Sequence, residues 1–208
     1  MSSTRNRTPS EYIGYGLYLY FLGLSLRNVV KALSFLHIIK RSHVAIWNWI
    51  QKYHPQRISS QRKRISELIV DETVIKVGSS DFIWLWVTIE PKNREILALT
   101  ISKERNMFVA ERFLSGLVSI YGKHLTVSTD GGTWYPQACR FLMQKRHIHS
   151  SFEKSLIERT IQYIKDRTNE CFDDYFPCKR KDKKCNLFHV KNWLNLFVNI
   201  HNKEVLNA

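Results

Sequence analysis

The spacing of hydrophobic and polar positions changes near residue 65 and divides the chain into two parts. Before that point, three segments carry apolar residues at the 3.6-residue spacing of helices, at 9–23, 26–36 and 43–53. Ser10, Ser25 and Ser42 stand where each of these helices begins, and serine is a favoured N-cap residue. The first part of the chain is therefore predicted to be helical.

After residue 65 the pattern becomes that of strands, and then of alternating helices and strands. Runs rich in β-branched and aromatic residues at 65–77, 82–90 and 95–102 are separated by turn residues and predict an antiparallel meander. Further strands are expected at 125–129 and 147–149, and helices at 107–121, 134–144, 155–169 and 188–202. This element order is that of a ribonuclease H-like α/β fold, so we expect a mixed five-stranded sheet flanked by helices.

Four segments are predicted from this change in pattern. Residues 1–8 are polar and basic and are expected to form a disordered tail, and residues 56–64 are expected to form a basic linker. Between them, three short helices with a break at 37–41 are typical of a helix-turn-helix domain over 9–55. A plain three-helix bundle that serves contacts or dimerisation is the alternative. Residues 65–208 are expected to form the ribonuclease H-like domain.

The third helix of a helix-turn-helix motif enters the major groove of DNA. With the apolar residues of 43–53 directed inward, His43, Asn48 and Gln51 are left toward solvent or DNA, and such side chains are suited to base edges or phosphates. The linker is cationic and is expected either to follow a phosphate backbone or to remain solvated. Its candidate DNA contacts are Arg62, Lys63 and Arg64.

The charge of the chain narrows the class of partner. Lys and Arg number 32 against 18 Asp and Glu, which leaves a net charge of +14. The resulting pI is about 9.8, and a polyanionic partner is expected at such values. Nucleic acid is the first interpretation, and a basic ribosomal or membrane-surface protein is the alternative.

No membrane segment is expected. The apolar stretch 15–24 is about half of the ~20 residues that a helix needs to cross a bilayer, and no small-residue cleavage site follows it. We therefore expect a soluble cytoplasmic protein without a membrane partner.

The cysteines predict little chemistry. Their spacing contains no Cys-x-x-Cys pair, so free thiols in a reducing compartment are the default interpretation. A metal site built from Cys171, Cys178 and Cys185 with His189 remains an open alternative.

Three carboxylates carry the candidate chemistry. Asp71 follows an apolar run that ends at Val70, Asp130 follows the strand at 125–129, and Glu158 lies in a predicted helix. The first and fourth strands of the expected fold are neighbours, so Asp71 and Asp130 are expected to meet, and a helix across the sheet can bring Glu158 to them. Carboxylates in such a group are ligands for hard divalent cations that assist phosphoryl transfer.

Each acid also has an ordinary structural interpretation. Asp71 can simply end a strand, with Glu72 as an exposed partner of Lys76, and Asp130 can be the Asp of an Asp-Gly turn. Glu158 can pair with a neighbour on a solvated helix face.

Two cations accompany the third acid. Lys165 lies two helical turns after Glu158 and so shares its face, where it is expected to hold the DNA backbone beside the metals. Arg159 has the same interpretation. For both side chains, a solvent-facing position without DNA contact is the alternative.

These residues resemble a known family. Asp71-Glu72-Thr73, Ser128-Thr129-Asp130 and Glu158 followed by Lys165 are similar to the DDE transposases of insertion sequences, in particular the insertion-sequence-six type and its archaeal relatives. Trp134-Tyr135-Pro136 and the run 42–49 also look similar, and the resemblance extends from about residue 9 to 201.

The resemblance implies a function and a set of partners. It implies a prokaryotic, nucleoid-associated transposase that cuts double-stranded DNA at the terminal inverted repeats of its element and joins the 3′ hydroxyls to target DNA. Asp71, Asp130 and Glu158 match the metal ligands of the family, for two Mg²⁺ or Mn²⁺ ions. Because two ends react, a homo-oligomer is expected, either a dimer or a larger assembly.

One departure from the family concerns the third acid. The interval between Asp130 and Glu158 is shorter than is usual for that type, which makes Glu153 a competitor. Glu158 is preferred because Lys165 follows it at the family's spacing. Two other functions stay open. They are a non-catalytic helix-turn-helix regulator derived from a transposase and a ribonuclease H-like nuclease, which the helix-turn-helix disfavours.

Overall fold

A computed structural model describes residues 8–36, 39–52, 65–77, 81–169 and 187–207. The predicted tail lies outside these residues except for residue 8, and the predicted linker lies wholly outside them. Also outside are the side chains predicted to contact DNA from the linker, Arg62, Lys63 and Arg64, and the cysteines Cys171, Cys178 and Cys185. The helices are α1 (Ser10–Phe21), α2 (Leu26–Phe35), α3 (His43–Lys52), α4 (Met107–Tyr121), α5 (Trp134–Phe141), α6 (Ser151–Asn169) and α7 (Leu187–Asn207). The strands are β1 (Glu67–Val77), β2 (Asp81–Ile89), β3 (Ile96–Ser102), β4 (Thr126–Thr129) and β5 (Lys145–Ile148).

The five strands form one mixed sheet in the order β3-β2-β1-β4-β5. The first three pair antiparallel as a meander, while β4 and β5 are parallel to β1. Strand β1 is therefore central, and its neighbour on one side is β4, as the element order predicted. This is the ribonuclease H-like arrangement, and the predicted fold class is confirmed.

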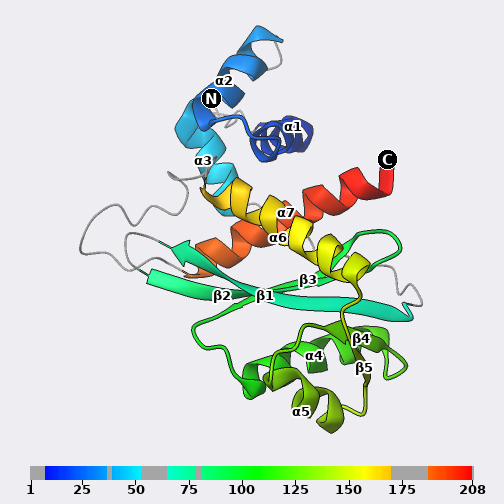
Figure 1. Cartoon of the computed structure of the whole chain (residues 1–208). Coiled ribbons are helices and arrows are strands. Elements are labelled where there is room, and N and C mark those ends of the chain that lie inside the picture. Colours follow the sequence, from blue (N-terminus) through cyan, green and yellow to red (C-terminus); the bar gives the residue numbers. More distant parts are fainter. Residues whose placement is uncertain (1–7, 37–38, 53–64, 78–80, 170–186, 208) are drawn as a thin grey trace.

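The alternation of side chains along β1 assigns its residues to the two faces of the sheet. Leu68 and Val70 belong to a buried cluster with α4 and α5, whereas Ile69 and Ile75 belong to a second cluster with α6 and α7. Figure 1 shows these helix pairs on opposite sides of the sheet. The odd-numbered residues of β1 therefore face α6, and the even-numbered residues face α5.

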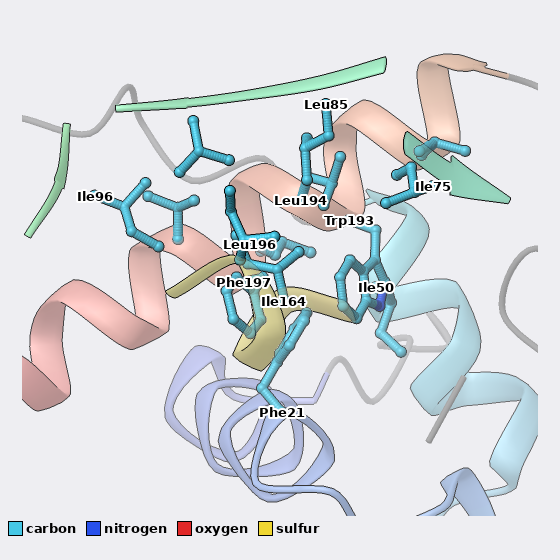
Figure 2. Packing of buried hydrophobic residues seen from close by; sticks show 14 of the residues in the cluster. Phe21, Ile50, Ile75, Leu85, Ile96, Ile164, Trp193, Leu194, Leu196 and Phe197 are labelled. Atoms are coloured by element: carbon cyan, nitrogen blue, oxygen red, sulfur yellow. The ribbon is translucent and has the colours of Figure 1, made fainter. Parts of the chain in front are cut away.

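Helix α7 joins the N-terminal helices to the sheet. Phe21 of α1 and Ile50 of α3 lie in the same hydrophobic core as Trp193 and Phe197 of α7, as Figure 2 shows. Phe21 and Trp193 have ring centroids 5.3 Å apart. The core is thus continuous across the boundary that was predicted between residues 9–55 and 65–208.

Hydrogen bonds reinforce this junction. The Trp193 indole N–H donates to the Tyr20 hydroxyl at 3.3 Å, and the Asn192 amide donates to the Ile50 carbonyl at 2.9 Å. Farther along α7, the Asn202 side chain both donates to and accepts from the backbone of Ile96 at 2.9 Å. Buried amides that are satisfied in this way fix the position of α7 between α3 and β3.

Several element ends differ from their predicted positions. Helix α6 begins at Ser151, one turn before the predicted 155, because Ser150 and Glu153 cap it reciprocally through their side chains. Helix α5 ends at Phe141, and Met143 just beyond it has a positive φ of 54°. The prediction that Ser10 caps α1 was wrong, since Pro9 occupies the N-cap position.

The described helices include none that is both long and apolar enough to cross a membrane.

Candidate functional site

The sheet brings Asp71 and Asp130 together. Asp71 lies in β1 directly after Val70, which pairs with Thr129 of β4, and Asp130 directly follows Thr129. Because β1 and β4 are parallel neighbours, the two aspartates meet where β4 ends. One carboxylate oxygen from each of Asp71, Asp130 and Glu72 lies within 4.8 Å of the other two.

The backbone around Asp130 is held by its own turn and by β5. The Gly132 N–H donates to Asp130 Oδ1 at 2.9 Å, and the Arg146 guanidinium donates to the Asp130 carbonyl at 2.9 Å and to Thr129 Oγ1 at 2.7 Å. A Cβ at Gly132 would lie 2.9 Å from Asp130 Oδ1 and 2.8 Å from the Trp134 ring. The position therefore admits only glycine without a shift of the acid.

Asp71 has a strongly perturbed acidity. Burial raises its pKa from 3.8 to about 7, the Glu72 backbone N–H opposes the shift, and repulsion from Glu72, Asp130 and Glu158 adds to it. In the metal-free protein at pH 7, Asp71 is therefore about half protonated, whereas an isolated aspartate would be ionised. A divalent cation would offset the same repulsion, and the all-oxygen donor set is that preferred by hard cations. The residues present fit such a metal.

Glu158 approaches the cluster from α6. It lines an open cavity of about 520 Å³ together with Asp71, Arg159 and Lys165. Its side chain is 58% exposed and lies 3.9 Å from Lys154, an exposed pairing of the kind that contributes little to stability. The close group of oxygens around Asp71 does not include Glu158, but the acid faces the same space.

The competitor Glu153 is engaged elsewhere. It is buried and accepts hydrogen bonds from the Ser150 backbone N–H at 2.6 Å and from His147 at 2.8 Å. Burial opposes its ionisation, but the hydrogen bonds from Ser150 and His147 outweigh burial and lower its pKa to about 2. With Glu67, which lies 3.6 Å from His147, it forms a separate group at the start of α6.

Sequence reasoning missed the residues on the other face of β1. The sequence reasoning gave Glu72 a role only in the structural alternative, as an exposed partner of Lys76. Its side chain is in fact only 2% exposed and accepts a hydrogen bond from the Tyr135 hydroxyl. Burial raises its pKa, while the Tyr135 hydrogen bond lowers it. Arg105 lies 3.7 Å from Glu72 and over the rings of Trp84 and Trp134. The Trp-Tyr-Pro run after Asp130 was the available signal.

The predicted DNA-reading residues of α3 differ in exposure. His43 is exposed at the start of the helix, Asn48 is half-buried, and Gln51 is half-buried with its amide oxygen buried. Ile46 and Ile50 of the same helix are fully buried, as the apolar spacing predicted. The outward face of α3 therefore presents His43 more openly than Gln51.

Comparison with known families identifies the domain that contains the candidate acids. A family model for the DDE domain of insertion-sequence transposases of the IS240 type matches residues 65–203. The uncharacterized protein MJ0017 of Methanocaldococcus jannaschii is 29% identical over 198 residues, which cover 95% of this chain and 88% of that protein.

Comparison with solved structures finds an integrase catalytic core and a chain of an intasome. The magnesium-bound catalytic core of HTLV-2 integrase has 18% identity and a TM-score of 0.47, and the match covers 64% of this chain and 84% of that one. A chain of the simian T-cell lymphotropic virus intasome in complex with the PP2A regulatory subunit B56 gamma has 18% identity and a TM-score of 0.48, over 81% of this chain and 64% of that one.

Proposed function

Because the chain belongs to the family of insertion-sequence transposases with a DDE domain, we propose that it cleaves DNA at the ends of a mobile element and joins those ends to target DNA. The observation that supports this proposal best is the meeting of Asp71 and Asp130 at the end of β4, beside a cavity lined by Glu158. The substrates are double-stranded terminal repeats and target DNA.

Asp71, Asp130 and Glu158 are the proposed ligands of two Mg²⁺ or Mn²⁺ ions. Such a pair of ions, when bound, activates an attacking oxygen and stabilises the leaving oxygen of a phosphodiester. Asp71 is central to the set, because it adjoins Asp130 through the sheet and Glu158 through the cavity. Glu153 has the different role of anchoring α6, since its carboxylate already accepts several hydrogen bonds.

Cations on both parts of the chain are the proposed DNA contacts. Lys165 and Arg159 line the cavity beside Asp71 and are positioned to hold a phosphate backbone there. The predicted helix-turn-helix domain, residues 9–55, is proposed to bind the element ends through α3, and residues 65–208 to perform the reaction. The N-terminal contacts are His43, Asn48, Gln51 and the linker residues Arg62, Lys63 and Arg64.

Two DNA ends must react together, so we propose that the active species is a dimer or a larger homo-oligomer. Each protomer would then supply one set of carboxylates to one end.

The test is a strand-transfer assay with DNA that carries the element ends, in the presence of Mg²⁺ or Mn²⁺. D130N is expected to abolish cleavage and joining but to retain DNA binding. D166N, which removes one exposed carboxylate from α6 outside the cluster, is the matched control and should stay active. DNA binding without cleavage by the unsubstituted protein under any metal condition would instead support a non-catalytic regulator.

A further inference from the structure

Arg105 occupies an unusual position between the sheet and α5. It lies in the loop that connects β3 to α4, and its guanidinium carbon is 4.1 Å from the centroid of the Trp84 ring and 4.4 Å from that of Trp134. Contact with two indole faces restrains the guanidinium plane through cation–π attraction and stacking. The side chain is therefore held in place before any ligand arrives.

The loop that carries Arg105 is itself well tied. Ser102 Oγ accepts a hydrogen bond from the Trp86 indole at 2.8 Å and donates to the Glu104 carbonyl at 2.6 Å. Asn106 donates to the Glu104 carboxylate at 2.8 Å and accepts from the Val109 backbone N–H at 3.1 Å, so it caps α4. These bonds fix the backbone on both sides of Arg105.

This position places a cation directly beside the candidate metal ligands. Arg105 Nη1 is 3.7 Å from a Glu72 oxygen, and Glu72 belongs to the close group of oxygens with Asp71 and Asp130. Glu72 faces the α5 side of the sheet, whereas Lys165 approaches Asp71 from the α6 side. The carboxylates thus have cations on two sides.

The guanidinium still has unused hydrogen-bonding capacity. A distance of 3.7 Å to Glu72 is an ion pair but is too long for a hydrogen bond. Among the described residues, no acceptor forms a hydrogen bond with Arg105, although a guanidinium has five N–H donors. Its side chain is 39% exposed, so these donors can reach a ligand from solvent.

We propose that Arg105 binds a phosphate of the DNA strand on the α5 side of the carboxylates, opposite the cations of α6. This inference rests on the proposed function, because it takes the DNA backbone as the ligand. Arginine suits this role, since its planar fork matches phosphate oxygens while its face stays on the indole rings. Arg105 is accordingly a substrate-positioning residue.

A purely structural role is the competing explanation. In that case Arg105 only holds the loop against β2 and α5, and its replacement lowers thermal stability without changing how DNA binds. The two roles differ in the salt dependence of DNA affinity, because each phosphate contact contributes about 0.9 to the slope of log K against log salt.

The experiment compares R105Q and R105K with R140Q, which removes one exposed arginine from the far end of α5. The affinity of each protein for end DNA is measured at several salt concentrations. KM and kcat are measured in the strand-transfer assay, and Tm is measured in parallel. For R105Q we expect the salt slope to fall by about 0.9 and KM to rise roughly tenfold through the loss of a charge-assisted hydrogen bond. R105K should restore the slope, and R140Q should resemble the unsubstituted protein.

A lowered Tm with an unchanged salt slope and KM for R105Q would overturn the proposal in favour of the structural role. Failure of the proposed function has a different signature, namely no strand transfer by the unsubstituted protein. The salt slope still tests Arg105 in that case. If the unsubstituted protein does not bind DNA at all, the Arg105 proposal is overturned as well.

Discussion

At the scale of single residues, the acidity of the carboxylates at this site depends mainly on how deeply the sheet buries them. Asp71 and Glu72 are neighbours in β1, yet they face opposite sides, and burial raises the pKa of each. Glu72 has Tyr135 and Arg105 as partners, whereas Asp71 has mainly other carboxylates around it. Ionisation of Asp71 is therefore strongly unfavourable in the metal-free protein.

The first prediction concerns D71N in the metal-free protein. The pKa of Asp71 is about 7 when folded and about 3.9 when unfolded, so the folded state binds the extra proton and stability falls as pH rises through this window. D71N removes this loss. Its Tm should exceed that of the unsubstituted protein at pH 8 and match it near pH 4, while D166N should show no such pH-dependent gain.

Bound metal should reverse the order of the Tm values of the unsubstituted protein and D71N at pH 8. Addition of Mn²⁺ is expected to raise the Tm of the unsubstituted protein, because a ligand that binds only the folded state stabilises it. It should raise the Tm of D71N much less. An equal metal response in both proteins would contradict Asp71 as a ligand.

The second prediction separates Glu158 from Glu153. E158Q should abolish strand transfer and change the free energy of unfolding by less than about 0.5 kcal/mol, because Glu158 is exposed and only weakly paired. E153Q should keep activity while lowering stability, because Glu153 is buried with Ser150 and His147. Chemical denaturation and the strand-transfer assay give both values. The reverse outcome would make Glu153 the third acid.

At the scale of elements, α6 is the part whose placement the candidate site needs. Its N-terminus is capped by Ser150 and Glu153 and is tied to β5 through His147. One turn after the first residue of α6, Ser155 lines the cavity beside Asp71, and Glu158 lines it one turn later. The ionised Glu153 therefore fixes the helix on which the third acid stands.

The third prediction follows from the pKa of Glu153. It is about 2 when folded and about 4.3 when unfolded, so its contribution to stability is present above the unfolded value and is lost as pH falls toward 2. The difference in unfolding free energy between the unsubstituted protein and E153Q should accordingly be full at pH 6 and shrink below about pH 4. Urea titrations at several pH values measure it, and a pH-independent difference would refute the assignment.

At the scale of the whole molecule, the N-terminal helices and the sheet share one core. Phe21 is 2% exposed and packs against Trp193 and Phe197, and both of these residues belong to the helix that covers the sheet. Figure 1 shows α1, α2 and α3 gathered on the α7 side, away from α4 and α5. The same core includes Ile157 and Ile161 of α6, so the N-terminal helices pack into the cluster that supports this helix.

The fourth prediction tests this coupling with F21A. Loss of a buried phenylalanine ring costs about 3 to 5 kcal/mol, and here it should lower the stability of the whole chain in a single unfolding transition. Circular dichroism and tryptophan fluorescence should report the same midpoint. F35A is the control, since Phe35 is 82% exposed and its replacement should have little effect. Two separate transitions in F21A would show independent domains.

The local sequence determined the elements and the order in which they follow. Apolar runs such as 68–70 and caps such as Ser25 and Ser42 are short-range signals, so most helices and strands lie where the spacing predicted. Element order alone also predicted that Asp71 and Asp130 meet, because it made β4 the parallel neighbour of the central strand β1, and β4 ends beside Asp71.

Only the tertiary structure decided which side chains surround those two acids. Glu72 became a buried partner of Tyr135 and Arg105, and Glu153 an anchor of α6, through contacts between residues far apart in sequence or on different elements. Hydrophobic spacing records which face of an element is buried, but not which polar group lies opposite it. Burial raises the pKa of Asp71, and hydrogen bonds lower that of Glu153. Both effects arise only when the sheet and its helices assemble.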